Sequence, residues 1–476
     1  MEPGRALSAL DARKSEAIAP EVLATPLDRG KRIAISIRER RALLAIADYI
    51  VGVAGCLVAY LILRPPHMQT IPILDLLMYG AAWVIALFIV DGYSFQIPSS
   101  RMQSTIAVVK AAPLAGLAGV IAFFLDPYVM TRPLIVVSTL VGAAFLVLMR
   151  TTVARLLLHE SLAVRAVLVG RGEPSVDIVE TLKAARFECR LVGRLIGPAD
   201  TETERTQLIT EVRTLLRSNA ADELIVTSND LRVLPGLIEE CVTTGVRVVS
   251  ASTLVERYMG RVPVDAIDTH WYLSLPDNDL WERPYAVARR LIDVLLSVVV
   301  SIPFLVLLPI LALSIKLDSP GPVFHVQRRT GRHGREFDLL KLRTMHAHAE
   351  SQGAQFTSRS DPRVTRVGRV LRACRLDEVP QMLNVVRGEM SFIGPRPERP
   401  EFMAMLEEQI PRFSARLLVK PGLTGWAQVK GGYASTVPEM TRKLEYDLYY
   451  IKNRSFRLDF QILANTFTTV LGLSGR

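Results

Sequence analysis

Long apolar stretches separated by short polar segments dominate the first third of the chain. They follow a basic tail of residues 1–42 and occupy residues 43–63, 71–90, 105–125 and 133–149. Each approaches the roughly 20 apolar residues that a helix needs to cross a bilayer. The pattern therefore predicts a bundle of four transmembrane helices over residues 43–150.

The distribution of Lys and Arg predicts the orientation of this bundle. The tail before the first stretch and the segment after the fourth are rich in basic residues, whereas the connections at 64–70 and 126–132 carry only Arg64 and Arg132. Cytoplasmic segments of membrane proteins carry an excess of Lys and Arg. We therefore expect the N-terminus, the 91–104 loop and everything after residue 150 in the cytoplasm.

Residues 160–270 alternate short apolar strands with helical stretches. Strands are expected at 166–169, 191–196, 223–227 and 246–250, and helices at 205–217 and 231–244. Strands that alternate with helices are typical of a parallel sheet, so a Rossmann-like α/β cytoplasmic domain is predicted. Ser175 stands where the third glycine of the dinucleotide fingerprint, which begins at Gly170 and Gly172, is expected. A regulatory or assembly domain without a cofactor is therefore preferred to a domain that binds NAD.

A fifth apolar stretch, at residues 291–317, is interrupted by Pro303 and Pro309. A proline removes one helical hydrogen bond and clashes with the preceding turn. The segment that follows is strongly basic, and a full crossing would place it outside, against the charge rule. We therefore expect a re-entrant membrane helix that breaks near Pro303, with Ser301 as a partner for the freed backbone groups. An ordinary kinked span is the alternative.

Two adjacent acidic residues stand out in the last unit, residues 284–476. Asp377 and Glu378 precede Pro380, and proline suits the first turn of a helix. Asp377 is therefore expected at the helix N-cap, where N–H groups without partners favour anions such as phosphates. Neighbouring helical residues point about 100° apart, so one carboxylate can attack while the other holds a divalent metal. A plain N-cap without a catalytic role is the alternative.

Three basic residues of the same unit are candidates for binding phosphates. Arg396 lies in Gly394-Pro-Arg-Pro397, a stiff extended segment, and its guanidinium is suited to bidentate phosphate binding. Lys341 and Arg343 alternate along a predicted strand, so they are expected on one face, where they would neutralise a diphosphate. A rigid surface turn and a solvated strand edge are the alternatives.

Composition fits this division into lipid-facing and water-facing parts. The 476 residues are 50% hydrophobic and 22% charged, with a net charge of +10 from 57 basic and 47 acidic residues. We assign the excess charge to the membrane flanks and a phosphate-binding site, and not to nucleic acid. The four cysteines lie far apart, which argues against a disulfide framework or a zinc site. No G-x-x-x-x-G-K-[ST] motif is present, which argues against a P-loop NTPase.

The motifs of residues 284–476 closely resemble those of the bacterial polyprenyl-phosphate sugar-1-phosphate transferases of the monotopic type. The matching motifs are Ser319-Pro-Gly-Pro-Val-Phe, Lys341-x-Arg-Thr-Met345, Leu376-Asp-Glu-x-Pro-Gln-x-x-Asn384, Gly394-Pro-Arg-Pro397 and Pro421-Gly-Leu-Thr-Gly-Trp-Ala-Gln428. More loosely, the N-terminal part resembles the large members of this family, which initiate exopolysaccharide or O-antigen synthesis. The resemblance thus implies an α/β catalytic domain with a re-entrant helix at 291–317.

The resemblance implies a two-step reaction. Asp377 would attack the β-phosphorus of a UDP-sugar, with a hexose and above all glucose as the favoured sugar, and expel UMP. Undecaprenyl phosphate would then take the phospho-sugar from the carboxylate. Glu378 would be associated with Mg²⁺, together with Asp377, and Lys341 and Arg396 would lie near the phosphates.

The resemblance also implies a place in the cell. The catalytic domain would lie on the cytoplasmic face of the bacterial inner membrane, in contact with membrane lipid, and either a single chain or a homodimer is compatible with it.

One departure from the family pattern concerns the re-entrant helix, because the family carries Ser directly before the breaking proline and Ile302 precedes Pro303 here. A membrane glycosyltransferase that releases UDP and a non-enzymatic, nucleotide-sensing scaffold are the alternative functions.

Overall fold

A computed structural model gives the structure of the chain and divides it into two compact units, each described by itself. The basic tail predicted at residues 1–42 lies outside the described residues up to residue 36. The description covers residues 37–471 except 64–72, 91, 94–100, 126–130, 158–162, 171–175, 185–188, 197–205, 207–208, 211, 215–220, 228–234, 268, 277–281, 347–360 and 433–435.

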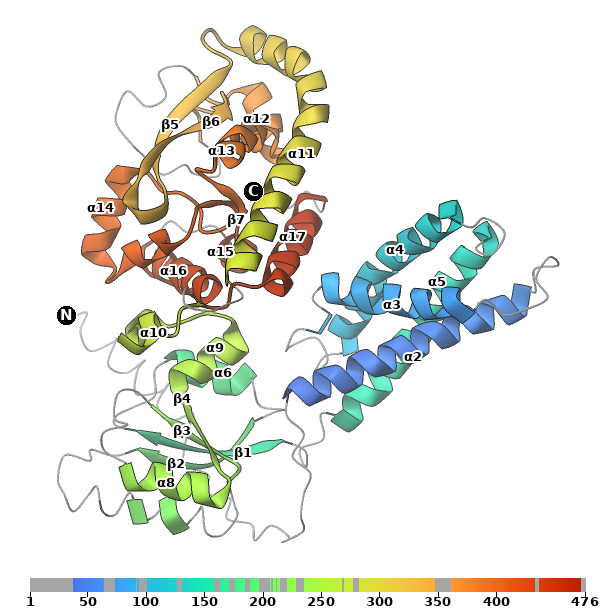
Figure 1. Ribbon diagram of the computed structural model, residues 1–476, viewed down its shortest axis with the longest axis vertical. Coiled ribbons are helices and arrows are strands. Elements are labelled where there is room, and N and C mark those ends of the chain that lie inside the picture. The colour runs from blue at the N-terminus through green and yellow to red at the C-terminus, as the bar shows by residue number, and fades with distance from the viewer. Residues whose placement is uncertain are drawn as a thin grey trace, which may run out of the picture. The chain divides into compact units, whose positions relative to one another are not determined.

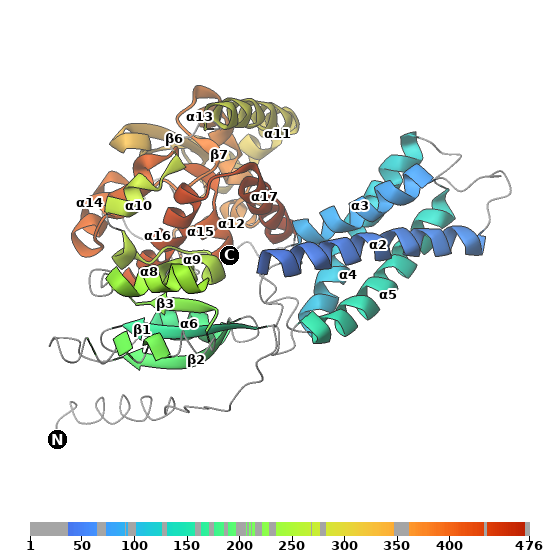
Figure 2. The ribbon, with the colours of Figure 1, turned by 60° about the horizontal axis from the view of Figure 1, so that its bottom comes forward.

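The predicted membrane segments form four helices. These are α2 (Ile37–Leu63), α3 (Ile73–Ile89), α4 (Arg101–Leu125) and α5 (Arg132–Leu157), which lie together in Figures 1 and 2. By length and composition, α2, α4 and α5 contain segments able to cross a membrane, whereas α3 has 17 residues and falls short of that length. The prediction of four apolar helices is confirmed, with the second shorter than expected.

Small residues allow these helices to pack closely. A Cβ atom on Gly52 would lie 3.2 Å from the Cα atom of Gly80, and one on Gly142 would lie 2.8 Å from the Nε1 atom of Trp83. Trp83 itself is fully buried. Close approach at small residues is how helices associate in lipid, where no hydrophobic effect drives them together.

The predicted α/β domain contains a four-stranded parallel sheet. Its strands are β1 (Val164–Gly170), β2 (Cys189–Ile196), β3 (Glu223–Val226) and β4 (Arg247–Ser250), in the order β2-β1-β3-β4. Helices α6 (Val176–Ala184), α8 (Pro235–Thr244) and α9 (Ala251–Met259) accompany them. All four predicted strands are confirmed, and so is the helix predicted at 231–244 from Pro235 onwards, since residues 231–234 lie outside the described residues. The glycine-rich turn at 171–175 and most of the helix predicted at 205–217 lie outside the described residues.

The α/β domain ends earlier than residue 270, where the sequence analysis placed its boundary. The first unit ends at Met259, and Gly260 turns the chain with a φ of +63°. The next elements, η4 (Val264–Ala266) and α10 (Thr269–Leu273), lie in the second unit, whose part from Gly260 to Arg476 is called the C-terminal unit below. Val262 and Trp271 are buried in its core, because their apolar side chains complete a cluster that the C-terminal helices leave open.

The long helix α11 (Glu282–Asp318) follows α10 in the C-terminal unit, and short helices and small sheets make up the rest of it (Figure 1). Strands β5 (Phe324–Thr330) and β6 (Glu336–Leu342) form an antiparallel pair, and β7 (Ser391–Ile393) and β8 (Gly422–Thr424) form a parallel pair. The helical elements are η6 (Arg332–Gly334), α12 (Arg366–Ala373), η7 (Leu376–Gln381), α13 (Met382–Arg387), α14 (Pro400–Gln409), η8 (Phe413–Leu418), α15 (Trp426–Lys430), α16 (Val437–Lys452) and α17 (Phe456–Leu471).

Helix α11 continues through both of its prolines. It runs for 37 residues without interruption, and Figure 1 shows its axis curving in the part that precedes β5. The predicted break at Ser301 and Pro303 is therefore wrong. A single proline removes one backbone hydrogen bond, which bends a helix without ending it.

The two ends of α11 are both fixed to the C-terminal unit. Near its beginning, the Arg290 guanidinium donates to the carbonyl of Val385 at 2.6 Å, and Asp293 accepts the Phe392 N–H at 3.0 Å. At its end, the Asp318 carboxylate accepts the Val367 N–H at 2.8 Å. Between these ends, only 11% of the most apolar 18-residue stretch of the helix is buried. An exposed apolar surface therefore separates two ends that both contact the rest of the C-terminal unit.

Candidate active site

Asp377 and Glu378 lie in the first turn of η7, a six-residue 3₁₀ helix. Arg375 precedes this helix in the left-handed conformation, with a φ of +57°, and occupies its N-cap position. The prediction that Asp377 is the N-cap, with Pro380 in the first helical turn, is therefore wrong. Successive residues of a 3₁₀ helix point about 120° apart. The two carboxylates consequently still face different partners, as predicted.

The carboxylate of Asp377 is buried and incompletely bonded. The residue is 8% exposed, and its Oδ1 atom is buried without a hydrogen-bond partner among the described residues. Burial, aided by the charge of Glu378, raises the pKa of Asp377 to about 6 against the opposing effect of nearby cations. These cations are Arg372, Arg396 and Lys341.

Glu378 is held by two guanidinium groups. Its Oε1 atom lies 2.7 Å from Nη2 of Arg396, and its Oε2 atom lies 3.7 Å from Nη1 of Arg375. Burial raises the pKa of this carboxyl, but Arg396 and Arg375 outweigh it, and the pKa falls below its usual value. Glu378 is therefore ionised at neutral pH. Asp377, with a pKa of about 6, begins to take up a proton when the pH falls slightly below neutral.

Lys341 belongs to the same electrostatic group. It lies on β6, and its Nζ atom donates to Oε1 of Gln327 on the paired strand β5 at 3.3 Å. Burial and the nearby guanidinium groups of Arg329 and Arg396 lower its pKa to about 8, with Asp377 acting in the opposite direction. The structure thus brings Lys341, Arg396, Asp377 and Glu378 together, as the sequence motifs indicate.

Arg343 lies apart from this group. Its guanidinium donates to the carbonyls of Ser319 at 2.6 Å, Pro320 at 3.1 Å and Ile315 at 3.3 Å, which follow or end α11. The prediction that Arg343 binds phosphate on the same face as Lys341 is not supported. Strand β6 ends at Leu342, so the alternation of side chains stops one residue before Arg343.

Arg372 is a site residue that the sequence analysis missed. It lies on α12, and its Nε atom donates to Oγ1 of Thr344 at 2.9 Å. Burial lowers its pKa, and Asp377 and Asp361 are the acids that most oppose this shift. An arginine recurs at every third position from Arg363 to Arg375, but that spacing does not show which member faces Asp377.

The site offers a metal ion two protein ligands, the carboxylates of Asp377 and Glu378. Among the described residues, no group of three or more His, Cys, Asp or Glu side chains is placed to hold an ion. Mg²⁺ commonly takes one or two protein carboxylates and completes its shell with water and substrate phosphates. The neighbouring carboxylates of Asp377 and Glu378 therefore fit a magnesium ion that shares its coordination with a phosphorylated substrate.

Comparison with known proteins places the chain in a family. Residues 284–472 match the family model described as bacterial sugar transferase. A protein of Caulobacter vibrioides, named UDP-glucose:undecaprenyl-phosphate glucose-1-phosphate transferase, is 41% identical over 212 residues, which are 44% of this chain and 79% of that protein. The chain belongs to the bacterial sugar transferase family.

Other bacterial sugar transferases share the same part of the chain. A UDP-N-acetylgalactosamine-undecaprenyl-phosphate N-acetylgalactosaminephosphotransferase of Aeromonas hydrophila is 40% identical over 234 residues, which are 49% of this chain and 54% of that protein. A UDP-glucose:undecaprenyl-phosphate glucose-1-phosphate transferase of Escherichia coli is 36% identical over 196 residues, which are 40% of this chain and 42% of that protein. The match thus spans about half the length of these two relatives.

The different environments of Lys341 and Arg343 predict opposite effects on stability. Arg343→Met removes a guanidinium that is bonded to three carbonyls, and each hydrogen bond to a charged group contributes about 1.5–3 kcal/mol. The thermal midpoint of this variant should therefore fall. Lys341→Met removes a cation that burial disfavours, so the thermal midpoint should rise. Thermal unfolding of the detergent-solubilised protein at pH 7 measures both changes. Equal losses in the two variants would contradict the assignment.

Proposed function

We propose that this protein transfers a sugar 1-phosphate, with glucose favoured, from a UDP-sugar to undecaprenyl phosphate. The observation that carries the proposal is the arrangement around Asp377, a buried carboxylate with a free Oδ1 atom next to an ionised glutamate and basic groups. The names of the relatives from Caulobacter vibrioides and Escherichia coli, which specify glucose, support the choice of sugar. The product would initiate exopolysaccharide or O-antigen assembly.

In the proposed first step, Asp377 is the nucleophile. Its Oδ1 atom, which no described residue engages, bonds to the β-phosphorus of the UDP-sugar. The bond from this phosphorus to the bridging oxygen breaks, and UMP leaves with the bonding electrons. Covalent catalysis of this kind divides one difficult transfer into two easier ones.

In the proposed second step, undecaprenyl phosphate accepts the phospho-sugar. One of its phosphate oxygens attacks the same phosphorus, and the Asp377 carboxylate is released as the leaving group. The cationic groups of Lys341 and Arg396 suit the stabilisation of charge on the phosphoryl oxygens in both steps, since they already surround the carboxylates.

Asp377 and Glu378 would also hold the magnesium ion that the reaction needs. When bound, the ion neutralises charge on the transferring phosphoryl group. Because Glu378 is ionised and paired with Arg396, it would provide the permanent anionic ligand, while Asp377 provides the attacking atom.

The attachments of α11 support a re-entrant helix in the inner membrane. Arg290 and Asp293 near its beginning and Asp318 at its end all bond to the polar C-terminal unit. A full crossing would place these two ends on opposite sides of about 30 Å of hydrocarbon. A helix that enters and returns, bending through Pro303 and Pro309, leaves both on the cytoplasmic face. The Rossmann-like α/β domain would act as a regulatory or assembly domain without a cofactor.

The released nucleotide tests the reaction type most simply. The purified protein would be incubated with Mg²⁺, undecaprenyl phosphate and a panel of UDP-sugars that includes UDP-glucose and UDP-N-acetylgalactosamine. We expect UMP and a lipid-linked sugar diphosphate, and Asp377→Asn should abolish both. Release of UDP would indicate a glycosyltransferase. No nucleotide release with any sugar would favour a scaffold.

Activity should follow a bell-shaped dependence on pH. Asp377 attacks only as a carboxylate, and its pKa is raised to about 6, so kcat/KM should rise with pH through that region. Lys341 binds phosphate best as a cation, and its pKa is lowered to about 8, so kcat/KM should fall above it. In Lys341→Arg the basic limb should move to higher pH, because arginine stays protonated. An unchanged basic limb in this variant would exclude Lys341 as its source.

A further inference from the structure

The loop that presents Arg396 has no helix or strand of its own, although its backbone carbonyls are bonded. At its two ends the donors are backbone groups: Gly422 N–H donates to the carbonyl of Pro395 at 2.9 Å, and Thr330 N–H donates to the carbonyl of Glu398 at 3.0 Å. These bonds join the loop to β8 and β5. Backbone bonds of this kind are the usual way in which buried polar groups are satisfied.

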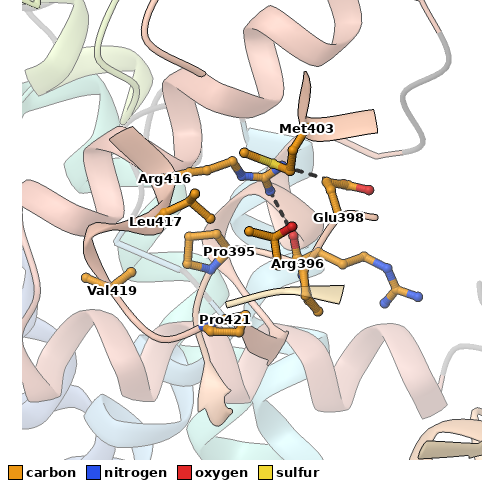
Figure 3. Close-up of a pocket in the computed structure, with 10 residues that line it drawn as sticks. Pro395, Arg396, Glu398, Met403, Arg416, Leu417, Val419 and Pro421 are labelled. Atoms are coloured by element: carbon orange, nitrogen blue, oxygen red, sulfur yellow. Dashed lines mark hydrogen bonds and ion pairs between the residues drawn. The ribbon is translucent and has the colours of Figure 1, made fainter. Parts of the chain in front are cut away.

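The two carbonyls in the middle of the loop are bonded by arginine side chains. Arg416 Nη2 donates to the carbonyl of Arg396 at 3.0 Å, and Arg329 Nη1 donates to the carbonyl of Pro397 at 2.9 Å. Figure 3 shows the Arg416 guanidinium directed at this backbone, while the side chain of Arg396 points away from Arg416. The backbone of Arg396 is therefore held by Arg416, on the side opposite to its own side chain.

Arg416 is buried within a network of charges. Its side chain is 2% exposed, and Nη2 also donates to Oδ2 of Asp447 at 2.8 Å. Nη1 lies 3.6 Å from Oε1 of Glu398, and Lys443 reaches the same oxygen at 3.0 Å. The guanidinium is thus neutralised by Asp447 and Glu398, and its Nη2 atom also donates to the Arg396 carbonyl.

Stability alone is a weak reason for so many buried charges. Desolvation of a buried ion pair commonly offsets its attraction, and apolar residues of similar volume often replace such pairs without loss. The bond from Arg416 to the Arg396 carbonyl has a consequence beyond stability, because the other end of Arg396 bonds to Glu378 at 2.7 Å. A shift of about 1 Å in a catalytic group can cost about a hundredfold in rate.

We propose that Arg416 is a positioning residue of the active site, which fixes the backbone of Arg396 so that its guanidinium meets Glu378 and the substrate phosphate. The proposal rests on the proposed function in one respect, because phosphoryl transfer is the reaction whose rate it affects. Arg416 acts through Arg396 and contributes nothing to the reaction by itself.

A double-mutant cycle on the full-length, detergent-solubilised protein tests this dependence. In the wild-type background Arg416→Lys keeps the charge and loses the forked donor geometry, and kcat should fall by about tenfold or more with a smaller change in KM. In an Arg396→Ala background the same substitution should change kcat by less than about twofold. If the steady-state rates in the Arg396→Ala background are too low, the rate of UMP release in a single turnover with excess protein completes the same cycle.

Two further variants separate positioning from folding. Arg416→Met combined with Asp447→Leu removes both buried charges, so it should retain the fold, by near-ultraviolet circular dichroism, but show the same loss of kcat. Lys443→Met removes another cation, which contacts the side chain of Glu398 and, among the described residues, bonds to no backbone carbonyl of the loop; its kcat should stay within about twofold of wild type.

The outcomes distinguish the two proposals. Equal losses from Arg416→Lys in both backgrounds would overturn the positioning role, as would an equal loss of kcat in Lys443→Met. A wild-type protein that releases no UMP with any UDP-sugar would instead refute the proposed function. Non-additive losses confined to Arg416 and Arg396 support the positioning role.

Discussion

The buried carboxylate of Asp377 is the constraint around which the C-terminal unit is organised. An ionised carboxylate loses its hydration on burial, and this loss must be offset by cations or hydrogen bonds. Here the offset comes from cations that leave the Oδ1 atom unengaged: Lys341, Arg372 and Arg396 act electrostatically, and no described residue bonds to that oxygen. The arrangement keeps Asp377 mostly ionised at neutral pH and leaves one of its buried oxygens without a hydrogen-bond partner among the described residues.

The surrounding elements hold these charges in place. Helix η7 places the two acids in one turn, strand β6 contributes Lys341, and the loop after β7 contributes Arg396. Arg343 fixes the end of α11 to the segment that leaves β6, and Arg416 fixes the loop that carries Arg396. Structural arginines thus anchor the backbone from which the proposed catalytic side chains project.

Much of this organisation can be predicted from local sequence patterns. Apolar stretches of sufficient length gave the helices α2–α5, and short β-branched runs gave the strands β1–β4. The motifs at Asp377, Glu378, Lys341 and Arg396 identified residues that the structure brings together. These features depend on the periodicity and chemistry of neighbouring residues, which the sequence displays directly.

The features that could not be predicted depend on distant contacts or on a single backbone angle. The left-handed conformation of Arg375 starts η7 before Asp377, and the end of β6 at Leu342 sends Arg343 towards α11. Trp271 completes a core that belongs to the C-terminal helices, although its neighbours continue from the α/β domain. No local pattern in the sequence specifies such partners.

The central claim is that Asp377 carries the phospho-sugar covalently, and mass spectrometry tests it most directly. The protein would be incubated with UDP-glucose and Mg²⁺ without undecaprenyl phosphate, quenched and cleaved with trypsin. Cleavage after Arg375 and Arg387 gives a peptide that contains both Asp377 and Glu378, and fragmentation separates the two sites. We predict a hexose phosphate on Asp377 that disappears when undecaprenyl phosphate is added. UMP release without any adduct on this peptide, or an adduct on Glu378, would contradict the account.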